Sequence, residues 1–317
     1  GYVGSMAMYA FAFGEFAAGL SFVPEQIATL PTRPLLSVGA VAGFVGLNLV
    51  GARATGVVEN VLVAAKLLVL VAFGIAGLAF AGFVEPRPIT LGVDQLTTFS
   101  PIMAAAVSFV AFQGWQLLFY DQESIGDPVE TIKRAVYVSI PAAVVVYVLV
   151  GLATVTLAPE AITKQPHTAL ASAAGTVLSP WGLAWLGSLV ISLSALVSTG
   201  SAINATLFST GYFAKGMLTD DLLPDRVGDP DADGVPYRTL LLLGVLTSAL
   251  TVLGSLGAIT SFASLAFIVV FGTMSAIALT QRAQDEVNAV IPAVGLVGTA
   301  GFLVLMLYHL YTAEFRT

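Results

Sequence analysis

Nine long apolar segments follow one another along this chain, and they constrain its fold more than any other feature. Most reach or approach the roughly 20 residues that a helix needs to cross the hydrocarbon core of a membrane. They run over residues 2–23, 35–52, 59–83, 99–120, 135–157, 177–212, 239–256, 259–280 and 288–311. None alternates polar and apolar residues with a period of two, which a barrel strand would show. The pattern therefore predicts an all-α integral membrane protein that crosses the cell membrane several times.

The composition excludes several classes of function. Of the 317 residues, 57% are hydrophobic and only 10% are charged. Cysteine is absent and the two histidines, His167 and His309, are far apart in the sequence, so we expect neither a metal site nor a cofactor. The formal net charge is −7, which argues against nucleic acid as a partner. The expected surroundings are the lipid bilayer.

Basic residues are distributed unevenly over the loops. If the loop after the first segment is outside, seven basic residues lie inside and four lie outside. The inside group is Arg53, Lys133, Arg134, Lys215, Arg226, Arg238 and Arg282, and the outside group is Arg33, Arg87, Lys164 and Arg316. Because cytoplasmic loops are enriched in Lys and Arg, we expect the loops at 121–134 and 213–238 to be cytoplasmic.

One apolar segment contains polar residues where lipid would favour leucines. Residues 109–116 read Phe-Val-Ala-Phe-Gln-Gly-Trp-Gln. Gly114 weakens a helix by about 1 kcal/mol relative to alanine, and it lets the backbone unwind and present amide and carbonyl groups to a ligand. The stretch is therefore a candidate binding point. The alternative is a continuous helix whose glutamines bond to neighbouring helices.

A charged residue, Lys66, falls seven residues into the apolar segment at 59–83. An ammonium group at that depth is costly unless it is paired or loses its proton, so we interpret Lys66 as functional. The alternative is snorkelling, because Lys66 would lie about 10 Å from the inner interface and its stem could cover much of that distance.

Three further features of the apolar segments need an interpretation. Glu15 lies near the outer third of its segment, where it could face water or belong to a proton relay. Gly39 and Gly43 have the spacing of a helix-packing motif. A run of hydroxyl residues could supply sodium ligands, although packing between helices is the interpretation we favour. This run comprises Ser192, Ser194, Ser198, Thr199 and Ser201.

Several motifs, in order along the chain, resemble amino acid permeases of the amino acid, polyamine and organocation (APC) superfamily. Residues 109–115, with Glu123, Asp127-Pro128 and Arg134-Ala135, resemble the sixth helix of that family and the loop after it. Residues 48–66 resemble the junction of the fourth and fifth helices, residues 203–236 resemble the eighth helix and its following loop, and residues 262–282 resemble the tenth. The sequence departs from the family pattern at Gln116, Ser124, Asp127 and Lys133, which weakens any assignment to a subfamily.

The resemblance implies a leucine-transporter-like bundle of two inverted repeats, with the sixth helix broken near Gly114. Residues 1–317 would form a single transporter domain. Residues 1–83 would be family helices three to five, 99–280 helices six to ten, and 288–311 helix eleven. The chain would then be a fragment without helices one, two and twelve.

The resemblance also implies roles for individual residues. Phe109 would be an aromatic gate over the substrate, Ala111 and Gly114 would leave room and free backbone groups, and Phe112, Gln113 and Trp115 would shape the pocket. Lys66 would take the place that a sodium ion occupies in other members and would carry a coupling proton. Ser198, Thr199 and Ser201 are the candidate ion ligands if sodium is used instead.

We therefore expect a secondary active transporter that imports or exchanges amino acids or amines by alternating access, coupled to protons. The alternatives are sodium coupling, exchange of two substrates, and a truncated remnant that does not transport. An enzyme is not expected, because the spans contain no His pair, Ser-His set or carboxylate cluster.

Overall fold

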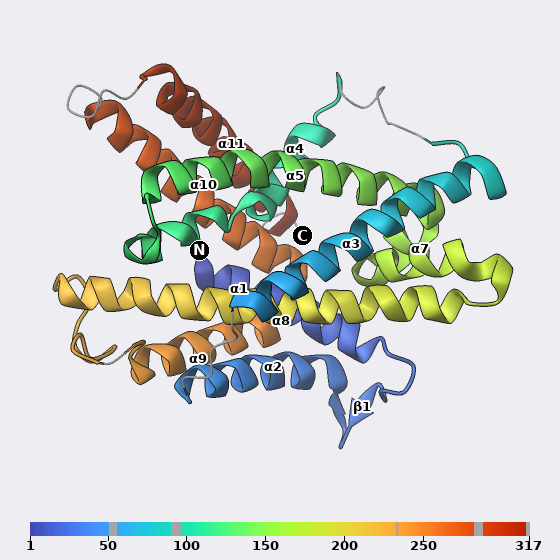
Figure 1. The fold of residues 1–317 in the computed structure, drawn as a ribbon, viewed down its shortest axis with the longest axis horizontal. Coiled ribbons are helices and arrows are strands. Elements are labelled where there is room, and N and C mark those ends of the chain that lie inside the picture. The colour runs from blue at the N-terminus through green and yellow to red at the C-terminus, as the bar shows by residue number, and fades with distance from the viewer. Residues whose placement is uncertain (51–55, 90–96, 233, 282–287, 315–317) are drawn as a thin grey trace. The chain divides into compact units, whose positions relative to one another are not determined.

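The computed structural model, which describes residues 1–50, 56–89, 97–232, 234–281 and 288–314, is almost entirely helical (Figure 1). The longer helices are α1 (Tyr2–Ala18), α2 (Thr32–Leu49), α3 (Gly56–Ala79), α5 (Pro128–Leu157), α8 (Ala184–Thr219), α9 (Tyr237–Leu253), α10 (Leu256–Gln281) and α11 (Val290–Glu314). The shorter helices are α4 (Ser100–Val107), α6 (Pro159–Lys164) and α7 (Ala169–Leu178). A π turn, η1 (Phe80–Val84), extends α3, and 3₁₀ segments occur at η3 (Ser108–Phe112), η4 (Trp115–Ser124), η5 (Pro166–Thr168) and η6 (Ser179–Trp181). Two short antiparallel strands, β1 (Gln26–Ile27) and β2 (Leu30–Pro31), form a hairpin between α1 and α2.

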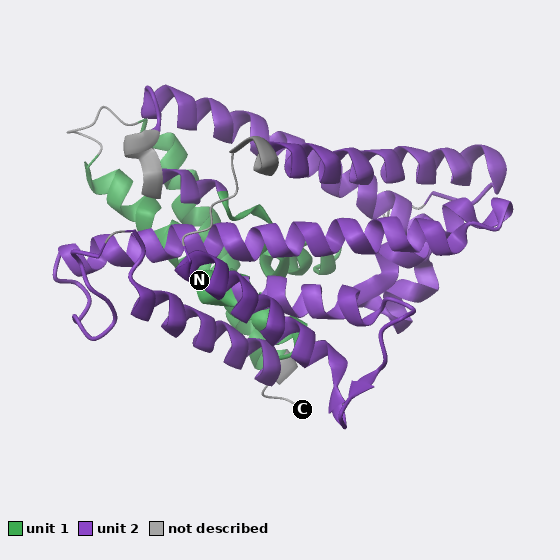
Figure 2. Cartoon of the chain, turned by 60° about the horizontal axis from the view of Figure 1, so that its bottom comes forward, with its two compact units in different colours: residues 1–5, 92–114, 254–317 green, residues 6–91, 115–253 purple. Residues whose placement is uncertain are grey.

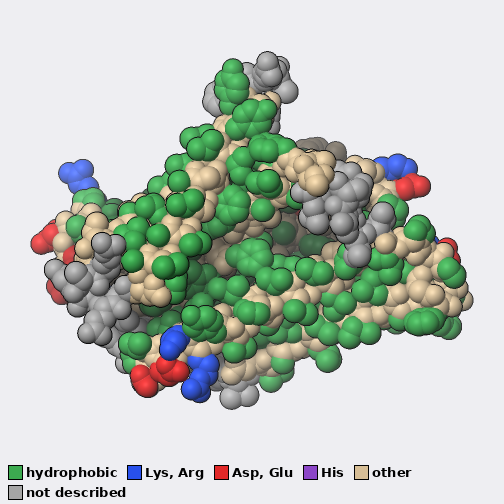
Figure 3. Space-filling view, turned by 90° about the horizontal axis from the view of Figure 1, so that it is seen from above, with side chains coloured by type: hydrophobic (Ala, Val, Ile, Leu, Met, Phe, Trp, Pro, Cys, Tyr) green, Lys and Arg blue, Asp and Glu red, His purple; other side chains and the backbone are tan. Residues whose placement is uncertain are grey.

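The nine apolar segments are largely helical in the described chain, so the all-α membrane fold is confirmed. Seven helical stretches of the described chain are long and apolar enough to cross a membrane. They are Thr32–Leu49, Asn60–Val84, Ser100–Phe119, Pro128–Leu157, Ala184–Thr219, Leu256–Gln281 and Val290–Thr312. The remaining two, α1 and α9, have 17 residues each. Hydrophobic side chains predominate on the face drawn in Figure 3, as expected for a surface covered by lipid.

The predicted start of the sixth segment, at residue 177, was wrong. Residues 177 and 178 end α7, a helix that the hydropathy pattern did not separate from the next one. A 3₁₀ turn containing Pro180 follows, and Gly182 takes a left-handed conformation with φ of 69°. Because proline and left-handed glycine both end helices, α8 begins only at Ala184.

The chain divides into two compact units (Figure 2). The first unit comprises Gly1–Ser5, Gly92–Gly114 and Gly254–Thr317, and the second comprises Met6–Leu91 and Trp115–Leu253. One of the boundaries falls between Gly114 and Trp115, inside the stretch that the sequence singles out as a binding point.

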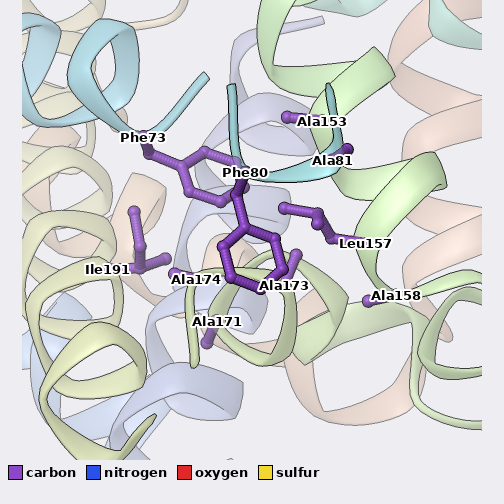
Figure 4. Close-up of a cluster of buried hydrophobic side chains, with 10 residues drawn as sticks. All are labelled: Phe73, Phe80, Ala81, Ala153, Leu157, Ala158, Ala171, Ala173, Ala174 and Ile191. Carbon is purple, nitrogen blue, oxygen red and sulfur yellow. The ribbon is translucent and has the colours of Figure 1, made fainter. Parts of the chain in front are cut away.

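The core of the second unit forms where α3, α5, α7 and α8 pack together. Phe73 and Phe80 lie at its centre, and small alanines surround them (Figure 4). The other members are Ala81, Ala153, Leu157, Ala158, Ala171, Ala173, Ala174 and Ile191. Because alanine side chains are small, the helix backbones can approach closely, as is usual in membrane bundles, and the two rings fill the space that remains.

A glycine allows a close approach between α7 and α8. A Cβ atom added to Gly187 would lie 2.3 Å from the carbonyl oxygen of Ala174, so no larger residue fits there. Ser188 adds a hydrogen bond, from its Oγ to the carbonyl oxygen of Ala171 (2.9 Å). By contrast, added Cβ atoms at Gly39 and Gly43 would meet no atom within 4 Å, so the packing role predicted for these two glycines was wrong within the described structure.

The first unit packs α4, η3 and α11 against α10. Its interior contains aromatic rings in edge or tilted contact, including Phe267 with Tyr2 (5.5 Å between ring centroids) and with Phe271 (5.9 Å). Phe267 itself is 2% exposed. Such contacts add to the dispersion energy that holds helices together inside a membrane.

Candidate functional site

The segment at residues 99–120, which resembles the sixth helix of the permease family, is broken. The α-helical part, α4, ends at Val107, and the chain continues as the 3₁₀ segment η3 to Phe112. Gln113 is extended (φ −83°, ψ 158°) and Gly114 has φ of 130°, after which the 3₁₀ segment η4 begins. The alternative of a continuous helix is therefore wrong, and the break predicted near Gly114 is confirmed.

Gly114 is needed for its backbone conformation and not for lack of space. A Cβ atom added to this residue would meet nothing within 4 Å. Its φ of 130°, however, lies in a region that residues with a side chain rarely adopt. The glycine thus permits the break between η3 and η4.

The predicted pocket residues of η3 differ in their surroundings. Phe109 is half-buried, and its ring lies 5.9 Å from that of Phe271 on α10 and 5.8 Å from that of Phe302 on α11. Ala111 and Phe112 are exposed, with 40% of Phe112 accessible. Phe109 is thus part of an aromatic cluster, while the two residues near the break present their side chains outward.

A buried serine that the sequence analysis did not single out contacts the broken segment. Ser264 on α10 is fully buried. Its Oγ donates a hydrogen bond to the carbonyl oxygen of Val107 (2.6 Å) and accepts one from the backbone N–H of Val110 (3.1 Å). The only sequence signal was a hydroxyl residue within a stretch that resembles the tenth helix of the family, and many hydroxyl residues occur in this chain.

Lys66 lies on the side of α3 that packs against other helices. It is half-buried, whereas its neighbours Leu67 and Leu68 are 46% and 72% exposed. Phe73, which belongs to the core of the second unit, follows Lys66 by seven residues and so lies on the same helix face. This placement favours a position inside the bundle over one that faces lipid.

One member of the hydroxyl run on α8, Thr199, bonds to the backbone of its own helix. Thr199 Oγ1 donates to the carbonyl oxygens of Ala195 (2.8 Å) and Leu196 (3.3 Å). Ser198 and Ser201 are half-buried on the same helix. A threonine that bonds back to its own turn satisfies its donor without a partner helix, which makes such residues tolerable inside a membrane.

Two asparagines from motifs that carry the family resemblance meet in the second unit. Asn48 near the end of α2 donates from Nδ2 to Oδ1 of Asn204 on α8 (2.8 Å) and to the carbonyl oxygen of Phe44 (2.9 Å). The two residues are 156 positions apart. Because an amide left alone in lipid is costly, this bond between Asn48 and Asn204 holds the two helices side by side.

Glu15 is paired, which explains its charge within an apolar helix. Its Oε1 lies 3.6 Å from Nε of Arg33 at the start of α2. The guanidinium carbon of Arg33 lies 4.0 Å from the centre of the Phe11 ring, and its terminal nitrogen donates to the carbonyl oxygen of Thr251 on α9 (3.4 Å). Arg33 therefore ties α1, α2 and α9 together at one end of the unit.

The predicted site residues are distributed over the two units. The first unit holds Phe109, Ala111, Phe112, Gln113 and Gly114, and the second holds Trp115, Lys66, Ser198, Thr199 and Ser201. Trp115 is half-buried and its ring lies 6.1 Å from that of Phe119. The next residue, Gln116, is 8% exposed.

Comparisons with known proteins relate this chain to membrane transporters. A family model described as amino acid permease matches residues 1–315. An uncharacterized protein of Methanocaldococcus jannaschii is 30% identical over an alignment of 319 positions that covers 99% of this chain and 70% of that protein. The inner membrane transport protein YbaT of Escherichia coli is 25% identical over 97% of this chain and 68% of its own length. The mouse b(0,+)-type amino acid transporter 1 is 25% identical over 65% of this chain and 42% of its own length.

Proposed function

This chain belongs to the amino acid permease family of the APC superfamily, and we propose that it moves amino acids across the plasma membrane by alternating access, coupled to protons. The family consists of multi-pass membrane transporters and not of enzymes, and the chain's helices fit that architecture. The substrate class, the coupling ion and the residues that bind them are the parts of this proposal that experiment must test.

The broken helix is the observation that carries the proposal. Extended Gln113 and Gly114, with its positive φ, interrupt an apolar helix that is otherwise long enough to span the membrane. A break of this kind places the ends of two half-helices at membrane depth, where their dipoles favour the ionic groups of a substrate.

Side chains near the break suit an amino acid. Ala111 and Gly114 are small and leave room for a substrate, and Phe112 presents an aromatic surface. Gln113 offers both a hydrogen-bond donor and an acceptor. In our proposal Phe109 closes over the bound substrate, and Gln113 and Trp115 contribute to selection of its side chain.

Lys66 is the proposed carrier of the coupling proton. It is half-buried within the membrane-spanning part of α3. In our proposal, gain and loss of the proton at Lys66 shift the transporter between its two conformations. Sodium coupling through Ser198, Thr199 and Ser201 is the competing proposal, and exchange of two substrates is the other.

Uptake by vesicles tests the proposal directly. The protein expressed from its complete coding sequence would be purified, reconstituted and supplied with a mixture of labelled amino acids under an imposed proton gradient, an imposed sodium gradient, or neither. We expect saturable uptake with the proton gradient alone. Uptake that follows sodium would favour the hydroxyl residues of α8, and uptake only into vesicles preloaded with amino acid would indicate exchange. No uptake under any condition would contradict the proposal.

Replacing Phe109 by alanine should separate a gating role from packing. If the ring covers the substrate, Phe109→Ala should weaken binding by about 1 to 3 kcal/mol. Phe302→Ala is the matched control, because it removes one of the same ring contacts from the side of α11. Equilibrium binding of labelled substrate and thermal stability in detergent would be measured for both. If both variants lose stability and neither loses affinity, Phe109 only packs.

A further inference from the structure

Ser264 lies where the broken helix changes from α to 3₁₀ geometry. In a continuous α-helix the carbonyl oxygen of Val107 would accept from residue 111, and the N–H of Val110 would donate to residue 106. In the 3₁₀ segment η3 the backbone bonds span three residues and not four. The carbonyl of Val107 also accepts from Ser264 Oγ, and the N–H of Val110 donates to the same atom. One hydroxyl from α10 thus serves two backbone groups on either side of the transition.

A hydroxyl is well suited to this task because it donates one hydrogen bond and accepts others. Serine supplies this group on the shortest side chain, and Ser264 is 0% exposed, so there is no room for solvent to replace it. Loss of the hydroxyl would remove both of its bonds from a buried place where water cannot replace them. The serine therefore favours the geometry of residues 107–110 in which both bonds form.

The same face of α10 also contacts the side chain of Phe109. Phe271 follows Ser264 by seven residues, so both lie on one side of the helix. The rings of Phe271 and Phe109 are 5.9 Å apart. Helix α10 therefore holds the broken segment at two levels, the backbone through Ser264 and the proposed gate through Phe271.

We propose that Ser264 is a positioning residue for substrate binding: its hydroxyl joins the two halves of the transition at Val107 and Val110 and thereby sets the backbone that leads into Gln113 and Gly114. This inference rests on the transport function proposed above. Ser264 touches the broken helix and not the substrate, so its removal should disturb the affinity of the site through the backbone.

Three variants in the protein expressed from its complete coding sequence test this role. Ser264→Ala removes the hydroxyl, and Ser264→Thr keeps it. Thr299→Val is the matched control, since Thr299 lies on α11 in the same unit and is 9% exposed, and its hydroxyl donates to Gly295 and Leu296 of its own helix. The KM and Vmax of uptake would be measured for each.

We expect Ser264→Ala to raise the KM by about tenfold or more, with a smaller effect on Vmax. Thr299→Val should stay within about twofold of the parent, and Ser264→Thr should recover most of the affinity. A serine that merely stabilised the fold would lower the amount of protein and the Vmax without changing the KM. An unchanged KM in Ser264→Ala, with the parent transporting normally, would overturn the inference, whereas a parent that does not transport would contradict the proposed function instead.

A second readout separates backbone positioning from a general loss of structure. Residues 1–317 contain no cysteine, so Ala111→Cys, made after any cysteine elsewhere in the complete protein is replaced by serine, provides a single labelling position beside the break. Substrate should slow maleimide labelling of the introduced thiol when Ser264 is present, and this protection should be lost at the same substrate concentration when Ser264→Ala is added. Retained protection would count against the inference.

If Ser264→Ala does not accumulate in the membrane, hydrogen exchange in the parent protein tests whether the bond between Val110 and Ser264 is present. The amide of Val110 should exchange at least about a hundredfold more slowly than in an unstructured peptide, because it is bonded to a buried oxygen. Exchange at the unprotected rate would show that the bond is absent in the membrane and would overturn the proposal.

Discussion

Replacing Lys66 by methionine should abolish uptake driven by a pH gradient while leaving substrate binding intact. Methionine fills a similar volume but cannot change its charge, so the coupling step would be lost and the pocket preserved. Lys66→Arg should have the same effect, because a guanidinium keeps its proton. Both variants would be measured in vesicles for uptake and by equilibrium binding for affinity.

The control for this experiment is Lys164→Met. Lys164 forms an exposed pair with Glu160 on the same helical turn (2.9 Å), and such pairs contribute little. Its loss should leave proton-driven uptake unchanged. If Lys66→Met also transported normally under a proton gradient, Lys66 would not carry the coupling proton, and the half-buried lysine would require a structural explanation.

The second large effect is expected at the break itself, where Gly114→Ala should reduce transport by about tenfold or more. There is space for the methyl group, so the cost comes from the backbone: φ of 130° is strained for any residue with a Cβ, by about 1 to 3 kcal/mol. The variant would relieve that strain by moving the backbone towards a helix, which would withdraw the polar groups proposed to bind substrate. Initial uptake rates and substrate affinity would be compared with those of the parent.

Gly43→Ala is a matched control for this substitution. Gly43 lies in α2, an added Cβ would also meet no atom within 4 Å, and its backbone conformation is an ordinary helical one. Alanine should therefore be neutral or stabilise the protein by up to about 1 kcal/mol. Full transport by Gly114→Ala would mean that the break does not form the substrate site.

The helices could be predicted from the sequence because lipid imposes one rule on nearly all residues. Any span has to satisfy its backbone internally, so a long apolar run can only be a helix. The break could be predicted for the converse reason: Gln113 and Gly114 are the wrong residues for a continuous span. The start of α8 could not be predicted, because the turn at Pro180 and Gly182 is nearly as apolar as the helices on both sides, and hydropathy does not separate them.

Contacts between distant residues were beyond prediction. Glu15 could be recognised as unusual, but nothing in its own helix pointed to Arg33 as its partner. Ser264 is one of many hydroxyl residues in the spans, and the bonds that distinguish it reach back 154 and 157 positions. Hydropathy describes each helix separately, and such contacts depend on which helices meet and at what depth.

The distance along the chain between Val110 and Ser264 has a consequence for how the protein is made. Ribosomes add about 5 to 20 residues per second, so about 8 to 30 seconds separate the synthesis of these residues. During that interval α4 and η3 have been made, but the hydroxyl that bonds to Val107 and Val110 has not. The polar transition therefore needs shelter from lipid, at the insertion machinery or in water, until α10 follows. A nascent chain halted between α9 and α10 should accordingly keep this segment near the exit of that machinery, while α2 and α9, which already have each other as partners, move into the bilayer.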